Sequence, residues 1–279
     1  MIKNVAIVSL SSGVIGEDTY RLWPYLFEND ELEHAINQKI FLGFSDTTIN
    51  HLMLHKLGLH SFYGQSFLPD LCELEKEILP YTKSYFSELI SNGTISEIRT
   101  SEVWYEERTD FSVAAVGTSR IQHENHGFEL LQGNGKFSGK ILGGCLESIY
   151  DIFDNSRYED TVSLCEKYGL FPSLEDWKGK ILLLETSEEQ PKPDDYRKML
   201  EKLKGTGIFD VVSGVICGKP MDEKYFEQYK EIIVDVVNQP TLPIVVNINV
   251  GHATPRCIIP FGVNACVDVE QQVIKFNDK

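Results

Sequence analysis

Short apolar runs alternate with amphipathic segments along the first third of the chain, and this alternation is typical of a parallel α/β sheet. Val5–Leu10 and Ile40–Leu42 have the composition of short buried strands. The segment after Ser45 carries apolar residues at helical spacing and ends at Gly58, which predicts a helix. Further helical patterns cover Thr19–Leu26, Glu31–Ile36 and Leu71–Ile90, the last broken near Pro80, and Ser61–Gly64 has a strand pattern.

Strand patterns become more frequent after Gly93. The polar, irregular segment Glu106–His126 is a candidate loop over a site. Expected strands lie within Thr94–Tyr105, Phe128–Leu131, Lys140–Leu142, Lys180–Glu185, Val211–Cys217, Ile244–Val250, Cys257–Pro260, Ala265–Val269 and Gln272–Phe276. Expected helices cover Gly143–Phe153, Asp194–Leu203 and Tyr225–Val237. We predict an α/β protein with an N-terminal parallel α/β sheet domain over 1–93 and a C-terminal β-rich domain with flanking helices over 94–279.

The amino-acid composition argues against some classes of binding partner. The 279 residues include 26 Lys and Arg against 42 Asp and Glu, for a net charge of −16. Such a surface repels nucleic acid and anionic membranes, so we expect neither as a partner. No apolar run has membrane-spanning length and no signal-peptide pattern is evident, which favours a cytoplasmic protein. The six cysteines are scattered and form no C-x-x-C, so we expect reduced thiols, no metal and no other cofactor.

Ser45 is the first candidate for chemistry. It lies in Gly43-Phe44-Ser45-Asp46-Thr47, between a predicted strand and a predicted helix. A serine at such a turn points into an open crevice, and the backbone N–H of Asp46 can face the same space as an oxyanion donor. Serine and threonine at this position are also ordinary helix caps, and the segment lacks the last glycine of G-x-S-x-G. Both interpretations stay open on this stretch alone.

Glu185 and His252 also come directly after apolar strands. The carboxyl ends of strands in an open α/β sheet meet at the edge where sites are built. Histidine can take the proton of a serine hydroxyl, and a carboxylate can fix the imidazole, so the three form a candidate triad. Against this, Glu185 could belong to a solvated acidic cluster with Glu188 and Glu189, and His252 could be a structural loop residue.

Two other features have a functional and a structural interpretation. His51 and His55 have metal-ligand spacing, but the H-E-x-x-H glutamate and a third ligand are missing, so we interpret them as surface or packing residues. Trp104 and Tyr105 could stack on a ligand or pack in the core.

Four motifs in register resemble the LD-carboxypeptidase family of serine peptidases, and most closely its branch of microcin C immunity proteins of the MccF type. These are Gly43-Phe44-Ser45-Asp46-Thr47-Thr48, Gly143-Gly144-Cys145-Leu146-Glu147, Leu182-Leu183-Leu184-Glu185-Thr186 and Val250-Gly251-His252-Ala253-Thr254-Pro255. The resemblance extends over most of the chain from Asp18 onward.

The resemblance implies a cytoplasmic, metal-independent, usually homodimeric amide hydrolase with a site between its two domains. Ser45 would be the nucleophile, Glu185 the orienting carboxylate and His252 the general base and acid, with the Asp46 N–H in the oxyanion hole. Gly143 and Gly144 would line the substrate pocket. As a base, His252 must be neutral, so we expect activity to fall below roughly pH 6.5.

Two substrate classes follow from the family. MccF-type enzymes cut the bond between a peptidyl aspartate and a nucleotide-like group, whereas LD-carboxypeptidases release a terminal D-alanine from cell-wall peptides. Because Trp104 could stack on a nucleobase, we favour a peptidyl-nucleotide substrate over a muropeptide.

The chain departs from the family near its start. Family members have two further strand–helix units where this sequence has only Ser11–Glu17, and seven residues cannot form them. The apparently shortened part includes the Gly-Gly turn that supplies the second oxyanion amide, and Gly16 aligns with its second glycine. The alternative to an active hydrolase is therefore a binding protein that has lost catalysis.

Overall fold

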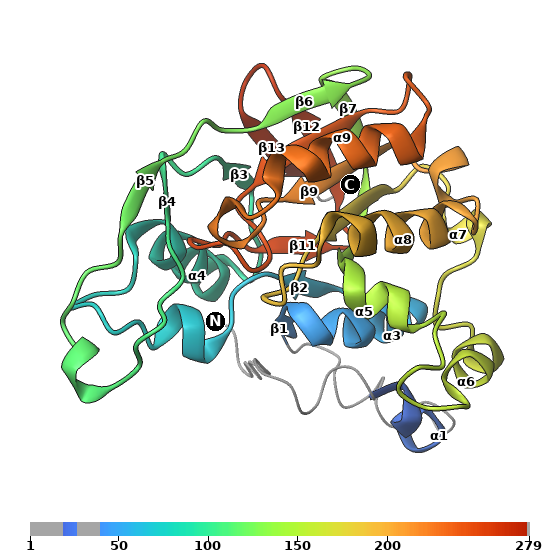
Figure 1. Ribbon diagram of the computed structural model, residues 1–279, viewed down its shortest axis with the longest axis horizontal. Helices are drawn as coiled ribbons and strands as arrows, with labels where there is room; N and C mark the ends of the chain where they lie inside the picture. Colours follow the sequence, from blue (N-terminus) through green and yellow to red (C-terminus); the bar gives the residue numbers. More distant parts are fainter. Residues whose placement is uncertain (1–18, 27–39, 278–279) are drawn as a thin grey trace.

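An eight-stranded mixed sheet forms the centre of the computed structural model, which describes residues 19–26 and 40–277 (Figure 1). Its strand order is β3-β13-β12-β7-β8-β9-β10-β6. The four strands β7 to β10 run parallel, and the outer strands pair antiparallel. The carboxyl ends of β7 to β10 therefore share one edge of the sheet, where sites are usually built.

The strands are β1 (Leu42–Gly43), β2 (Ser61–Tyr63), β3 (Glu97–Arg99), β4 (Val103–Tyr105), β5 (Gln122–Glu124), β6 (Glu129–Gln132), β7 (Lys136–Cys145), β8 (Ile181–Glu185), β9 (Gly214–Gly218), β10 (Ile244–Ile248), β11 (Ile259–Phe261), β12 (Asn264–Asp268) and β13 (Val273–Asn277). The α-helices are α1 (Trp23–Leu26), α3 (Thr48–Lys56), α4 (Pro80–Asn92), α5 (Leu146–Asp151), α6 (Thr161–Tyr168), α7 (Leu174–Trp177), α8 (Pro193–Lys204) and α9 (Phe226–Val237). Short helical turns are η1 (Thr19–Leu22), η2 (Ser45–Thr47), η3 (Phe67–Leu71), η4 (Val113–Ala115), η5 (Ile208–Asp210) and η6 (Met221–Glu223).

A smaller sheet, β1-β2-β11, joins distant parts of the sequence. β1 and β2 are parallel, whereas β11 pairs antiparallel with β2, with Pro260 opposite Phe62. The C-terminal half thus adds a strand to the sheet whose first strand, β1, ends just before Ser45. The division of the chain at residues 93 and 94 stays a prediction.

The central strands are buried along their whole length, which explains their continuous apolar composition. Every residue of β8, β9 and β10 is buried, as expected for parallel strands covered on both faces. Helices α8 and α9 lie side by side over one face (Figure 1), where Tyr196 stacks on Tyr229 with ring centroids 4.1 Å apart. The α/β class with a β-rich C-terminal part is confirmed.

Several predicted boundaries differ from the observed ones. Residues 72–79 are not helical, and α4 begins at Pro80 because proline suits the first helical position and keeps Leu79 extended. The strand predicted at Lys140–Leu142 continues to Cys145, so Gly143 and Gly144 lie in β7 and not in a helix. The predicted elements Val5–Leu10 and Glu31–Ile36 lie outside the described residues.

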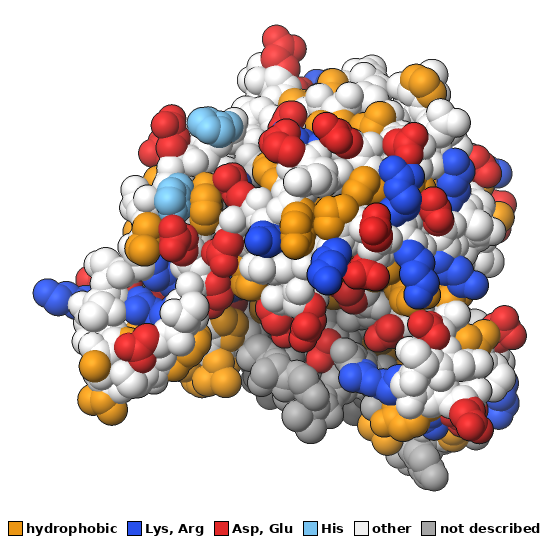
Figure 2. Space-filling view, in the orientation of Figure 1, with side chains coloured by type: hydrophobic (Ala, Val, Ile, Leu, Met, Phe, Trp, Pro, Cys, Tyr) orange, Lys and Arg blue, Asp and Glu red, His pale blue; other side chains and the backbone are white. Residues whose placement is uncertain are grey.

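Acidic and basic side chains are interspersed on the face shown in Figure 2. Arg197 of α8 pairs with Asp235 of α9 at 2.6 Å. Within residues 19–26 and 40–277, no helix has both the length and the hydropathy needed to cross a membrane.

His51 fixes α3 against the smaller sheet. Its side chain is completely buried, with Nδ1 2.7 Å from Ser61 Oγ and Nε2 3.1 Å from the Gly43 carbonyl oxygen. The packing interpretation of His51 is therefore confirmed. Burial lowers the pKa of His51 to about 3, since the charged ring would lose its hydration.

This pKa predicts a pH-dependent stability. The folded-state pKa lies below the unfolded value near 6.5, so the stabilisation is complete above pH 6.5 and is lost as the pH falls toward 3. Between pH 6.5 and 5 we expect His51 to cost about 2 kcal/mol of unfolding free energy. Urea unfolding at several pH values gives the free energy of unfolding of wild type and of His51→Gln. Plotted against pH between 5 and 6.5, it should have a steeper slope in wild type. Equal slopes in the two proteins would contradict it.

Candidate active site

Ser45 lies at a strained turn between β1 and α3. Its backbone has φ +62°, a conformation that non-glycine residues rarely adopt and that is found at nucleophile elbows. Thr47 Oγ1 donates to the Phe44 carbonyl at 2.8 Å and supports the turn from within. Phe44 precedes η2 and Thr47 precedes α3 as capping residues, neither with a side-chain cap bond. The capping interpretation of Ser45 is therefore wrong.

The structure brings Ser45, Glu185 and His252 together. His252 Nε2 lies 3.0 Å from Ser45 Oγ, and His252 Nδ1 lies 2.7 Å from Glu185 Oε2. Glu185 is the last residue of β8, and its side chain has no exposed surface. The carboxylate can hold the Nδ1–H while Nε2 faces the hydroxyl. This arrangement can activate a serine for attack on a carbonyl carbon.

Tyr63 closes this chain of hydrogen bonds into a ring. It is the last residue of β2 and is completely buried. Its hydroxyl donates to Glu185 Oε1 at 2.6 Å and accepts the Ser45 backbone N–H at 3.1 Å. Burial and the neighbouring Glu185 charge raise the pKa of Tyr63 well above its usual value. Tyr63 thus holds both the carboxylate and the backbone of the serine turn.

Arg256 holds the loop that carries His252. Its buried guanidinium donates to the carbonyls of Gly251 and His252, the second at 2.8 Å, and to Asp70 Oδ1 at 2.9 Å. The Phe44 ring lies 4.8 Å from the guanidinium carbon and 4.9 Å from the His252 ring centroid. Gly251 has φ +88°, and a Cβ there would lie 2.4 Å from Glu185 Oε2. Only glycine lets the loop pass so close to Glu185.

A second carboxylate contacts the imidazole. Glu188 Oε2 lies 2.9 Å from His252 Nε2, the nitrogen that also faces Ser45. Burial alone would lower the pKa of His252, but Glu185 and Glu188 outweigh burial and raise it to about 10. The hydrogen bond with His252 lowers the pKa of Glu188 to about 2. The two carboxylates thus favour the protonated imidazole.

Trp104 lies beside the His252 loop. Its strand β4 is joined to that loop by the Tyr105 N–H, which donates to the Thr254 carbonyl at 2.9 Å. Trp104 is buried and stacks on His123, with centroids 4.3 Å apart. The Lys219 ammonium lies 5.2 Å from the Trp104 centroid. The structure gives Trp104 a packing role next to the site, and its stacking on a ligand stays a prediction.

The segment that follows Trp104, residues 106–126, is held by buried ion pairs. Arg108 and Arg120 contact the two oxygens of Glu73 at 3.1 and 2.8 Å, and all three side chains are buried. The ion pairs tie this segment to the chain just after η3.

The other predicted site residues have different outcomes. Gly143 approaches β8 so closely that a Cβ would lie 2.0 Å from the Leu183 carbonyl oxygen. Gly144 makes room for Thr48 and Tyr63, so both glycines allow close packing, and their contact with substrate stays a prediction. Asp46 lies in η2 directly after Ser45, and its oxyanion role is also untested. Gly16 lies outside the described residues.

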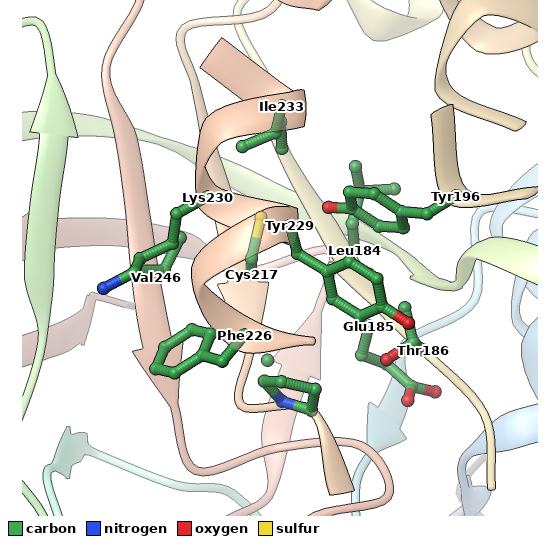
Figure 3. A pocket seen from close by; sticks show the side chains of 12 residues that line it. Leu184, Glu185, Thr186, Tyr196, Cys217, Phe226, Tyr229, Lys230, Ile233 and Val246 are labelled. Carbon is green, nitrogen blue, oxygen red and sulfur yellow. The ribbon is translucent and has the colours of Figure 1, made fainter. Parts of the chain in front are cut away.

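A small cavity lies behind Glu185, between the sheet and α9 (Figure 3). It measures about 20 Å³ and is lined mainly by apolar side chains, including Phe226 and Ile233. Such a volume holds about one water molecule, so this cavity is too small for a peptide or a nucleotide. Among residues 19–26 and 40–277, no group of three or more His, Cys, Asp and Glu residues could hold a metal ion.

Sequence reasoning missed Tyr63, Arg256 and the contact of Glu188. Tyr63 ends a short strand, as Glu185 does, and this shared position was the available signal. Arg256 follows His252 by four residues, but nothing in the sequence shows that its side chain folds back onto the loop.

Comparisons with known proteins agree with this arrangement. Residues 3–64 match the LD-carboxypeptidase N-terminal domain and residues 138–267 match its C-terminal domain. The chain is 66% identical to an MccF-like protein from Streptococcus pneumoniae, solved in complex with AMP, with a TM-score of 0.91; the match covers 95% of this chain and 77% of that one.

More distant relatives share the fold. The microcin C7 self-immunity protein MccF of Escherichia coli is 22% identical, with 100% of this chain and 76% of that protein covered. A solved structure of an MccF protein in complex with aspartyl sulfamoyl adenosine is also 22% identical, with a TM-score of 0.75, covering 100% of this chain and 78% of that one.

Tyr63→Phe tests the ring of hydrogen bonds. Removing the hydroxyl leaves Glu185 Oε1 and the Ser45 N–H without this partner, so we expect kcat to fall about 10- to 100-fold with little change in KM. Steady-state kinetics provides the measurement. Tyr85→Phe is the control, because the Tyr85 hydroxyl accepts the Arg99 N–H instead. A Tyr63→Phe enzyme as active as the control would contradict the role of Tyr63.

Proposed function

Because the chain belongs to the LD-carboxypeptidase family and is a hydrolase of the carboxypeptidase type, we propose that it cleaves the amide bond of a peptidyl-nucleotide, as a serine enzyme of the MccF type. The observation that carries the proposal is the contact of His252 with both Ser45 and Glu185. The substrate class, the triad roles, a cytoplasmic location and a homodimer are all part of the proposal.

In the proposed reaction, Ser45 Oγ attacks the scissile carbonyl and its proton passes to His252 Nε2. His252 gives that proton to the leaving nitrogen as the amide bond breaks, which leaves an acyl group on Ser45. Water, deprotonated by the same nitrogen, then attacks the acyl carbon and releases Ser45. Glu185 keeps Nδ1 protonated and stabilises the imidazolium, while the Asp46 N–H is the proposed oxyanion donor.

Two observations favour a nucleotide substrate. The MccF-like relative with 66% identity was solved with AMP, and the more distant MccF protein was solved with aspartyl sulfamoyl adenosine. The buried Trp104 supports the loop that carries His252, and its direct contact with a base is the less supported part of the proposal. The family description itself supports the second candidate, release of a terminal D-alanine from cell-wall peptides.

A direct assay compares the two substrates. Wild-type protein is incubated with an aspartyl-adenylate analogue joined by an amide and with a D-alanine-terminated tetrapeptide, and the products are separated by chromatography. We expect hydrolysis of the nucleotide substrate, and Ser45→Ala should lose it by at least about a thousandfold while keeping the fold. Faster release of D-alanine would favour the muropeptide assignment. If neither substrate is cleaved, a binding protein becomes the better description.

The pKa of His252 predicts a pH profile different from the one expected from sequence. Below its pKa the imidazole holds a proton on Nε2 and cannot act as a base, so activity increases as pH rises through that value. With a pKa of about 10 in the free protein, kcat/KM should still be rising above pH 7, and not level off above 6.5. Measurement of kcat/KM from pH 5 to 10 tests this. A plateau reached by pH 7 would contradict it.

A further inference from the structure

Two oxygens compete for one nitrogen at the centre of the site. His252 Nε2 lies 3.0 Å from Ser45 Oγ and 2.9 Å from Glu188 Oε2. In the mechanism, Nε2 must receive the proton of Ser45, which it cannot do while it donates its own proton to a carboxylate. Glu188 therefore opposes the reaction in the substrate-free protein.

The contact between Glu188 and His252 rests on a fixed loop. The N–H and the hydroxyl of Ser187 both donate to Glu147 Oε1, at 2.8 and 2.7 Å. The Glu189 N–H donates to Ser187 Oγ at 3.2 Å, and the Gln190 N–H donates to the Ser187 carbonyl at 3.1 Å. This turn, anchored on α5, holds the backbone of Glu188 in place. The Glu188 side chain therefore extends to His252 from a backbone whose position is fixed.

The two carboxylates on His252 differ in exposure. The Glu185 side chain is completely buried, whereas the Glu188 side chain is 59% exposed. Because the Glu188 carboxylate is more than half exposed, water screens its attraction to His252, and a competing cation can displace it. Arg256, the buried cation of the His252 loop, donates its hydrogen bonds to backbone carbonyls and Asp70, and none of them goes to Glu188. Of the two carboxylates that contact His252, Glu188 is therefore the one that can be replaced.

We propose that Glu188 determines specificity by gating the base: it holds Nε2 of His252 in the free protein and releases it to a substrate that carries an amine beside the scissile carbonyl. Glu188 reaches the space next to the Ser45 hydroxyl, because both oxygens contact the same nitrogen. An α-amine of the acyl residue, one carbon away from the attacked carbonyl, enters that same space. Its ammonium can pair with Glu188.

Protons balance in this exchange. The substrate ammonium keeps its protons and takes the place of the imidazolium beside Glu188. His252 then has only Glu185 as a carboxylate partner, and the Nε2 proton leaves to solvent water. Nε2 can now accept the Ser45 proton. An anionic group at the same position would instead be repelled by Glu188, so the gate favours aminoacyl over carboxyacyl groups.

The inference rests on the proposed function and narrows it to nucleotides whose acyl group is a single amino acid with a free α-amine, because the nitrogen of a longer peptidyl group is an uncharged amide. Matched substrates test it. One is an α-aminoacyl amide of a nucleotide and the other its 2-hydroxyacyl counterpart, equal in size but without the cation. We expect wild type to prefer the amine roughly fivefold in kcat/KM and Glu188→Gln to lose this preference. Glu189→Gln is the matched control, since the adjacent Glu189 side chain makes no contact with His252 in the described structure.

A preference that survives in Glu188→Gln, or one that is lost equally in Glu189→Gln, would overturn the proposal. So would a folded Glu188→Gln protein that is inactive on both substrates, because the gate only opposes the reaction.

NMR titration of His252 in the free protein separates failure of the gate from failure of the proposed function, since it needs no turnover. In Glu188→Gln the midpoint should move down by roughly 0.5 to 1 pH unit, the shift that corresponds to the fivefold preference. An unchanged midpoint would overturn the gate. If wild type hydrolyses neither substrate, calorimetry on Ser45→Ala measures the same amine preference as a ratio of Kd values, and equal Kd values would overturn the specificity.

Discussion

The site depends on a closed ring of hydrogen bonds around the Glu185 carboxylate. One oxygen holds His252 and the other holds Tyr63, and these two residues in turn contact the hydroxyl and the backbone N–H of Ser45. Ser45 and Tyr63 come from the smaller sheet, and Glu185 and His252 come from the ends of the larger one. A buried, fully partnered carboxylate thus fixes two sheets relative to each other, and an unpartnered one would be costly.

Local strain and close packing surround this ring. Ser45 keeps a positive φ because α3 and the ring determine its position, and such strain persists where the surroundings over-determine the backbone. Gly251 and Gly144 remove the side chains that would otherwise displace Glu185 and Tyr63. Glu188 adds the opposite tendency, since its carboxylate contacts the same Nε2 that faces Ser45. The contact of the imidazole Nδ1 with the buried Glu185 is therefore fixed, whereas the contact of Nε2 with the exposed Glu188 can be exchanged for another.

Many of the strands, and with them the positions of Glu185 and His252, could be predicted from the sequence, because a buried strand appears as a continuous apolar run. The apolar runs of β8 and β10 located the strand ends, where Glu185 is the last residue of β8 and His252 follows the end of β10 by four residues. β7 was predicted too short because Gly143 and Gly144 look like a break, although they serve close packing inside the strand. Tyr63 and Arg256 could not be assigned, since their carboxylate partners, Glu185 and Asp70, lie more than a hundred residues away in the sequence. Contacts of this kind arise only when strands from both halves of the chain pair.

The central claim is that the ring makes Ser45 a nucleophile through His252. Fluorophosphonate labelling tests it most directly, because the probe reacts covalently with an activated serine and requires no knowledge of the substrate. Mass spectrometry of the digested protein should place the label on Ser45 in wild type and find none in His252→Ala. A label on another residue, or labelling of His252→Ala as rapid as that of wild type, would contradict the account.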